Sequence, residues 1–124
     1  LKVAREIQTS LLPRDFPPFP DRKEFTLHAI NEPAKFIAGD FFDFFFINDE
    51  ILAVVMADVS GKGVPAAMFM AVARTAIRSF TVPGKMPAEI LKHVNDVMVR
   101  DNDNMMFVTV FYGFSLLSKI KFEN

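Results

Sequence analysis

The chain has 124 residues, the size of one ordinary domain, and its 51% hydrophobic and 23% charged residues indicate a globular protein rather than a disordered one. A net charge of −1 does not indicate a surface for nucleic acid or anionic membrane, and the absence of cysteine excludes disulfides and thiolate metal sites. The sequence shows no signal peptide and no apolar run of about eighteen residues, so a cytoplasmic location is the default expectation.

The first segment, residues 1–13, has the pattern of an amphipathic helix. Val3, Ile7 and Leu11 recur at helical spacing, and Pro13 ends the pattern. We expect this helix to link the domain to an upstream domain and to be able to pair with a second copy of itself. The alternative is that it packs only on its own domain.

Two apolar runs, residues 38–47 and 51–57, are separated by a short polar turn and predict a β-hairpin. If the turn is centred on Asp49, Asp40 faces Asp58 across the two strands. Directly opposed residues have Cβ atoms about 4.5–5.5 Å apart, so the two carboxylates would repel unless a positive group lies between them. A register shifted by one residue would separate the two acids.

Both faces of this hairpin are apolar, which predicts a central hairpin covered by helices on one face and by a second sheet on the other. Asp43 falls on the face opposite to that of Asp40. We interpret Asp43 as a strand-end acid bonded to backbone. The alternative is a metal ligand that a β-bulge turns toward Asp40.

Asp58 stands between an apolar strand and a glycine loop that leads into a helix. Gly61 and Gly63 allow the backbone to turn sharply, and Pro65 suits a first helical position. This order of elements holds one carboxylate rigidly at the rim of a core.

Two helices are predicted at residues 65–80 and 87–100. The first half of the earlier helix is apolar all round, which indicates burial. Arg74 and Arg78 lie one turn apart and more than two turns from Asp58, so we interpret them as a solvated face rather than as a phosphate clamp.

The remaining strands are predicted at residues 25–30, 105–117 and 120–122. A polar turn at residues 101–104 lacks the glycine and the closing glutamate of an EF-hand. The order of elements is one helix, three strands, two helices and two strands, which predicts an α+β fold.

The acids suggest a site for hard cations. Oxygen ligands without Cys or a usable His select Mg²⁺ or Mn²⁺, and a carboxylate shared by two such ions about 3.5–4 Å apart can support phosphoryl displacement. Asp40 and Asp58 are too few ligands for two octahedral ions. Waters, a carbonyl of the glycine loop and acids from elsewhere would have to complete the shell. No P-loop pattern and no Ser-His-Asp arrangement is visible.

Four motifs, in the same order along the chain, resemble the bacterial PPM-type serine/threonine phosphatases of the sporulation stage II protein E and sigma-B regulator (RsbU-like) class. The usual Gly-Gly-Asp is Ala38-Gly39-Asp40 here, and phenylalanines stand for the usual tyrosines at positions 41 and 42, which leaves the carboxylates in place. The motifs are Ala-Arg-Glu-Ile-Gln with Leu-Leu-Pro at 4–8 and 11–13, Ala-Gly-Asp-Phe-Phe-Asp-Phe at 38–44, Asp-Val-Ser-Gly-Lys-Gly-Val-Pro-Ala-Ala at 58–67, and Met-Phe-Val-Thr at 106–109.

The resemblance implies a β-sandwich flanked by helices (αββα), truncated here at its C-terminus, with a site for two Mn²⁺ or Mg²⁺ ions. By position, Asp58 would bridge both ions, Asp40 would hold one, and the Val59 carbonyl would face the same ion. The two aspartates would thus be the catalytic acids of this piece. The family's remaining acids come from later motifs that the chain does not contain.

The resemblance also implies a substrate, a phosphoserine on an anti-sigma-factor antagonist, and a role in partner-switching control of transcription. Residues 1–13 would be the linker helix from an upstream sensor or receiver domain, often used for dimerisation, and residues 14–124 the N-terminal part of the phosphatase domain. Two alternatives stay open: a non-catalytic phosphatase-like module that binds partners, and a dimerisation module whose acids are structural.

Overall fold

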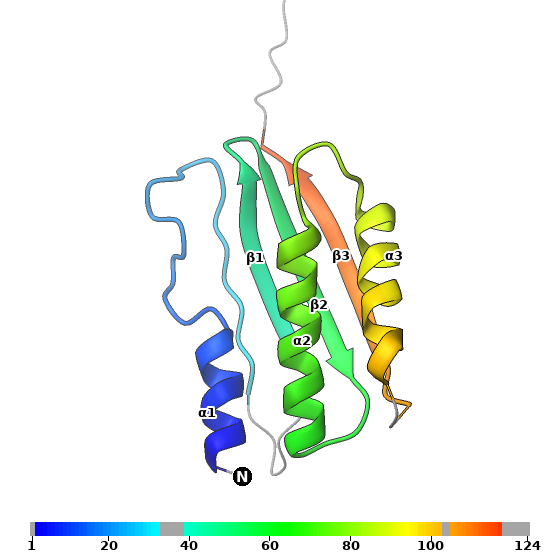
Figure 1. Ribbon diagram of the computed structural model, residues 1–124. Helices are drawn as coiled ribbons and strands as arrows, with labels where there is room; N and C mark the ends of the chain where they lie inside the picture. The colour runs from blue at the N-terminus through cyan, green and yellow to red at the C-terminus, as the bar shows by residue number, and fades with distance from the viewer. Residues whose placement is uncertain (1, 33–38, 103–104, 118–124) are drawn as a thin grey trace, which may run out of the picture.

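The computed structural model describes residues 2–32, 39–102 and 105–117, and this part of the chain forms a layer of helices against one antiparallel sheet (Figure 1). The sheet has the strand order β1-β2-β3, α2 and α3 lie across one of its faces, and α1 packs beside α2. The elements are α1 (Lys2–Leu11), β1 (Phe41–Asn48), β2 (Ile51–Val59), α2 (Val64–Phe80), α3 (Pro87–Met98), the 3₁₀ turn η1 (Val99–Asp101) and β3 (Val108–Leu116). The predicted α+β class is confirmed.

The hairpin of β1 and β2 has the predicted register. Opposed pairs run from Phe41 and Ala57 at one end to Phe46 and Leu52 at the other. The register then shifts beside the turn, where Asn48 pairs with Ile51. Because this irregularity lies at the turn, it does not change which residues face each other at the opposite end, where Asp40 precedes the first pair.

The core lies between this sheet and the helices. Alanines along α2 let its backbone approach the sheet closely, but only one side of its apolar first half is buried. The prediction that this half is buried all round is wrong, because Val64, Met68 and Val72 are 45%, 62% and 52% exposed. The buried members are Phe41, Val55, Ala57, Val59, Ala66, Met70, Ala73, Ala76, Ile77, Ile90 and Val94.

The opposite face of the sheet is covered in a different way from the prediction. Residues 25–30 form no strand, and the segment from 12 to 32 instead packs aromatic rings on β1. The ring centroid of Phe19 lies 4.7 Å from that of Phe46, and Phe16 approaches Phe44 at 5.9 Å. Pro17, Pro18 and Pro20 lack the N–H groups that a sheet ladder requires, so this part of the segment contacts β1 through side chains rather than backbone hydrogen bonds.

Farther along the same face, two large apolar side chains stay open to solvent. Met56 on β2 is 61% exposed and Phe111 on β3 is 69% exposed. The residues that the structure describes contain one sheet, so a second layer over this face is not seen within them.

Asp43 is enclosed beneath α2, and its surroundings correct one sequence interpretation. Its side chain is 1% exposed, and Arg78 donates to both carboxylate oxygens, at 2.6 and 2.7 Å. The Nε atom of Arg74 lies 3.8 Å from the same carboxylate. The prediction that these arginines form a solvated face is wrong for Arg74, whose side chain is 20% exposed, and holds only in part for Arg78, which is 39% exposed but binds Asp43. A buried carboxylate needs a counter-charge, and α2 crosses the strand at this point.

The interpretation of Asp43 itself is partly right. The backbone N–H of Phe44 donates to its Oδ1 at 3.0 Å, which is the backbone bond that was expected. Its main partner, however, is Arg78. Asp43 belongs to the helix-covered face, so the alternative of a metal ligand turned toward Asp40 is not what the structure shows.

Other element predictions hold closely. The two helices begin and end within a few residues of the predicted bounds, and β3 falls within the predicted strand at 105–117. The strand predicted at 120–122 lies outside the described residues. None of the described helices combines the length and apolar character that crossing a membrane requires.

Replacing Asp43 with asparagine should destabilise the fold, because the change removes the charge that compensates Arg78 while it keeps the shape of the side chain. We expect a loss of about 2–3 kcal/mol in the free energy of unfolding, less than the ~3–5 kcal/mol of a fully buried pair, since the Arg78 side chain is 39% exposed and can turn toward water. Denaturant titration measures the difference. The exposed Asp96→Asn change on α3 is the matched control, and equal losses for both variants would contradict the argument.

Candidate active site

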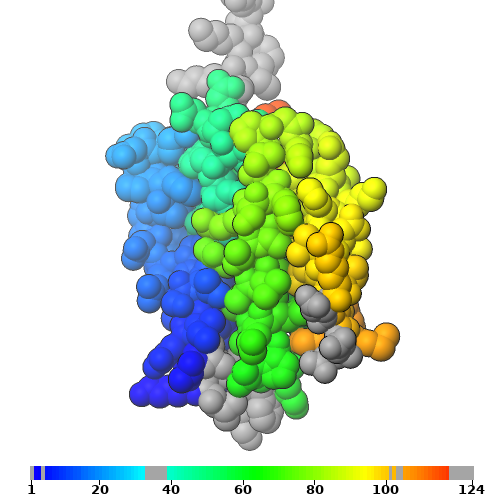
Figure 2. All heavy atoms as spheres, in the orientation of Figure 1, coloured from blue at the N-terminus to red at the C-terminus, as the bar shows by residue number. Residues whose placement is uncertain are grey.

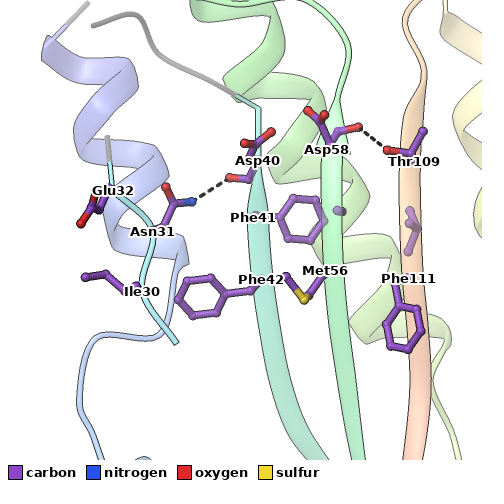
Figure 3. Close-up of a pocket in the computed structure, with 12 residues that line it drawn as sticks. Ile30, Asn31, Glu32, Asp40, Phe41, Phe42, Met56, Asp58, Thr109 and Phe111 are labelled. Carbon is purple, nitrogen blue, oxygen red and sulfur yellow. Dashed lines mark hydrogen bonds between the residues drawn. The ribbon is translucent and has the colours of Figure 1, made fainter. Parts of the chain in front are cut away.

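A hollow of about 670 Å³ opens at the end of the sheet where β1 begins and β2 ends (Figure 3). Asp40 and Asp58 both line it, from neighbouring strands, and both side chains are exposed to solvent. The other lining residues are Ile30, Asn31, Glu32, Phe41, Phe42, Met56, Ala57, Thr109, Val110 and Phe111. The hollow therefore combines three acids, Glu32, Asp40 and Asp58, with mostly apolar neighbours.

The two carboxyl groups lie close enough to influence each other's charge. The strand register places Asp40 opposite Asp58, one step beyond the last ladder pair, and Figure 3 shows both side chains at the same rim. A hydrogen bond with the Asp58 side chain, helped by partial burial and by repulsion from the Asp58 charge, raises the pKa of Asp40 to about 6. The structure thus brings together the two acids that the sequence paired.

The backbone of β1 approaches that of β2 very closely just before Asp40. Gly39 is buried, and a Cβ atom built on it would lie 2.4 Å from the Cβ of Val59 and 3.2 Å from the Val59 carbonyl oxygen. The Val59 N–H also donates to the Gly39 carbonyl, at 3.4 Å. Only a residue without a side chain fits here, and the Val59 carbonyl lies beside the residue that precedes Asp40.

Two amide side chains hold the main chain of Asp40. Gln8 of α1 donates from Nε2 to the Asp40 carbonyl at 3.3 Å, and Asn31 donates from Nδ2 to the same oxygen at 3.2 Å. The first helix therefore contacts the candidate site directly. Neither contact could be predicted from local patterns, because both join residues that lie apart along the chain, although Gln8 belongs to the motif at 4–8.

The chain after Asp58 is fixed by bonds to the start of β3. The Ser60 N–H donates to the Phe107 carbonyl at 2.8 Å, and the Phe107 N–H donates to the Ser60 hydroxyl at 2.9 Å. The Asn102 side chain in turn bonds both the carbonyl and the N–H of Met106, at 2.6 and 2.8 Å. Asparagine commonly stabilises turns in this way, so a polar turn before a strand was a signal that could have suggested Asn102.

The glycine loop itself has the predicted conformation. Gly61 and Gly63 both have φ of 80°, which is the left-handed region that residues with side chains rarely adopt. The loop can therefore turn directly from the end of β2 into α2, and Asp58 stays at the rim.

The donors present fit part of a site for a hard divalent cation. Carboxylate oxygens are what Mg²⁺ and Mn²⁺ prefer, and the hollow offers those of Asp40 and Asp58. Val59, whose carbonyl the family resemblance assigns to the same ion, is buried and is not among the residues that line the hollow. Glu32, which the sequence reasoning did not consider, also lines the hollow, but its carboxylate points away from Asp40 in Figure 3. Within the described ranges, no three acids or histidines cluster closely enough to bind a metal by themselves.

Comparison with known proteins identifies the family. The model of the stage II sporulation protein E family matches residues 48–121. The chain belongs to this family of PPM-type phosphatases. Among curated relatives, it is 33% identical to the phosphoserine phosphatase RsbU of Bacillus subtilis over 98% of its own length, and 34% identical to protein IcfG of a Synechocystis strain over 91%.

Solved structures agree with this assignment. The SiaA-PP2C domain of Pseudomonas aeruginosa has 26% identity and a TM-score of 0.63 over 87% of the chain. The RsbU and RsbW domains of a Mycobacterium tuberculosis protein give 30% identity and a TM-score of 0.57 over 65% of the chain. The chain spans 35% of the length of RsbU, 22% of IcfG, 45% of the Pseudomonas structure and 22% of the Mycobacterium structure.

Replacing Gly39 with alanine should disturb the site more than its small size suggests. The new Cβ would collide with Val59, so the two strands must separate at the position that sets the spacing of the acids. We expect lower thermal stability together with weaker Mn²⁺ binding by the full-length protein. Gly113→Ala on β3, where an added Cβ would meet only a carbon of Phe111 at 3.9 Å, is the control and should leave Mn²⁺ binding unchanged. Normal Mn²⁺ affinity in the Gly39 variant would contradict this account of the site.

The acid pair should also set how stability depends on pH when divalent ions are removed by a chelator. Since the pKa of Asp40 is about 6 in the folded state and about 3.9 in the unfolded one, the folded state holds the proton more tightly between these values. This contribution to stability is fully present below about pH 4 and is lost as the pH rises through 6.

The variant Asp40→Asn should therefore lose this part of the pH dependence and have a higher melting temperature than wild type at pH 7.5 in chelator. Addition of Mn²⁺ should raise the melting temperature of wild type only. Melting curves over pH 4 to 8 provide the measurement, and an Asn variant that is less stable than wild type in chelator would contradict the repulsion described here.

Proposed function

We propose that this chain is the N-terminal part of a metal-dependent protein serine/threonine phosphatase that hydrolyses phosphoserine on an anti-sigma-factor antagonist. The observation that carries the proposal is the meeting of Asp40 and Asp58 at one rim of the hollow, from strand ends that hydrogen bonds and close backbone packing hold in place. Relationship to a phosphoserine phosphatase supports the same reaction class.

In this proposal Asp58 and Asp40 hold the metal ions, with the Val59 carbonyl as a further ligand. Ions bound there would supply an activated water and would neutralise charge on the phosphoryl group. The chain itself contributes the spacing of the acids. Gln8 and Asn31 hold the Asp40 main chain, and the Thr109 hydroxyl donates to the Asp58 carbonyl at 3.4 Å.

The proposed partners follow from the family and from its named members. The antagonist would be the phosphorylated substrate, and the output would be partner-switching control of a sigma factor. A regulator of this kind acts where transcription takes place, so the proposal places it in the cytoplasm.

The proposal also assigns the parts of the chain. Residues 1–13 would be the linker helix from an upstream sensor or receiver domain, and residues 14–124 would begin the phosphatase domain. Two apolar residues of α1 are open to solvent: Val3 is 67% exposed and Ile7 is 40% exposed. Their exposure supports a homodimer that forms through this helix.

The variant Asp58→Asn tests the proposed reaction in the full-length protein with Mn²⁺ and a phosphoserine protein as substrate. The change keeps the shape of the side chain and removes the charge that would hold the metal. We expect turnover to fall by about 100-fold or more, since even outer partners of a metal ligand are worth about 10–100-fold. Phosphate release and Mn²⁺ affinity should be measured on the same samples.

Asp96→Asn makes the same chemical change at an exposed position on α3 and should leave turnover unchanged. Equal turnover in wild type and Asp58→Asn would reject Asp58 as a catalytic acid. A full-length wild type that binds the antagonist without hydrolysing its phosphoserine would favour the non-catalytic alternative instead.

A further inference from the structure

A second pocket, of about 280 Å³, lies between α2 and the segment that follows α1. Three arginines line it: Arg14 from the chain just after α1, and Arg74 and Arg78 from α2. Figure 2 shows α1 and α2 side by side on this face of the molecule. The pocket shares no lining residue with the hollow that holds Asp40 and Asp58.

The arginines of this pocket differ in their hydrogen bonds. Arg78 makes two short bonds to Asp43, which also accepts the Phe44 N–H, so this carboxylate already has three donors. Arg74 is left with a contact of 3.8 Å, too long for a hydrogen bond. Its Nε atom is buried and has no hydrogen-bond partner.

A buried donor without a partner costs free energy, and for a charged group the cost is larger. The charge of Arg74 is also poorly compensated. Its burial lowers the pKa of Arg74, and repulsion from Arg78 lowers it further, against the attraction of Asp43. One acid, Asp15, is among the residues that line the pocket, and it is exposed to solvent.

We propose that this pocket binds a small tetrahedral oxyanion, of which inorganic phosphate and sulfate are the simplest. An anion in the pocket would supply the negative charge that the Arg74 side chain lacks, because Asp43 is already hydrogen-bonded to Arg78. Arg14, which also lines the pocket, would add a second guanidinium. Guanidinium groups present several donors in a fixed plane, which suits the oxygens of phosphate.

The proposal is independent of the phosphatase reaction and can be tested without it. Phosphate and sulfate should be titrated into the full-length protein in chelator, with heats of binding and melting temperature as readouts and sodium chloride of equal ionic strength as reference. We expect both anions to bind and to raise the melting temperature above that in chloride. Arg74→Gln should weaken phosphate affinity by about tenfold or more, in line with hydrogen bonds to charged groups.

Two further variants make the result decisive. Arg14→Gln changes an exposed residue, so its folding should be normal, and it should also weaken phosphate binding. Arg100→Gln, an exposed arginine of η1 that does not line the pocket, should bind phosphate like wild type.

Absence of phosphate binding to wild type, or unchanged affinity in the folded Arg14 and Arg74 variants, would overturn the proposal. Asp58→Asn should retain phosphate binding in chelator. A failure of the oxyanion pocket can therefore be told apart from a failure of the proposed phosphatase site.

Discussion

The site depends on the close opposition of two carboxylates that the fold does not neutralise. Asp40 and Asp58 stand at neighbouring strand ends, where like charges opposed across a sheet are destabilising. In the protein alone, a hydrogen bond with Asp58, partial burial and repulsion from the Asp58 charge together raise the pKa of Asp40. A fold that keeps such a pair exposed at the rim of a hollow retains an unfavourable arrangement that a divalent cation would relieve.

The surrounding structure keeps the pair from drifting apart. On the β1 side, Gly39 lets the backbone lie against Val59, and amide side chains hold the Asp40 carbonyl. On the β2 side, Ser60 is tied to Phe107 by two hydrogen bonds. Since these contacts come from α1, the loop after α3 and both neighbouring strands, the acids are positioned by most of the described chain rather than by the hairpin alone.

Much of this arrangement could be predicted because its signals are local. The apolar runs and the polar turn between them determine the hairpin register, and the register alone places Asp40 opposite Asp58. The glycine loop and Pro65 likewise mark the start of α2 within a residue. Alternation and capping patterns of this kind act over a few residues, so they are visible in the sequence.

What could not be predicted depends on contacts between distant segments. Residues 25–30 alternate like a strand, yet they form none, and Phe25 instead packs its ring on Phe46 of β1. The helical spacing of Arg74 and Arg78 looks like a solvated face until α2 is placed over Asp43. Gln8 lies in the motif at 4–8, but its contact with Asp40, like that of Asn31, exists only when these segments meet the residue before β1.

Two acids near the start of β1, Asp40 and Asp43, have opposite surroundings. Asp40 and Asp43 are three residues apart and face opposite sides of the sheet. Asp43 is buried, and Arg78 of α2 compensates its negative charge within the protein. Asp40 is exposed, has another acid as its neighbour and has no cation among the residues that line its hollow. A carboxylate whose charge is compensated within the protein has no need of a further cation, whereas one that stands beside a like charge is available to bind one. This contrast is the physical reason why the proposed function rests on Asp40 and Asp58 rather than on Asp43.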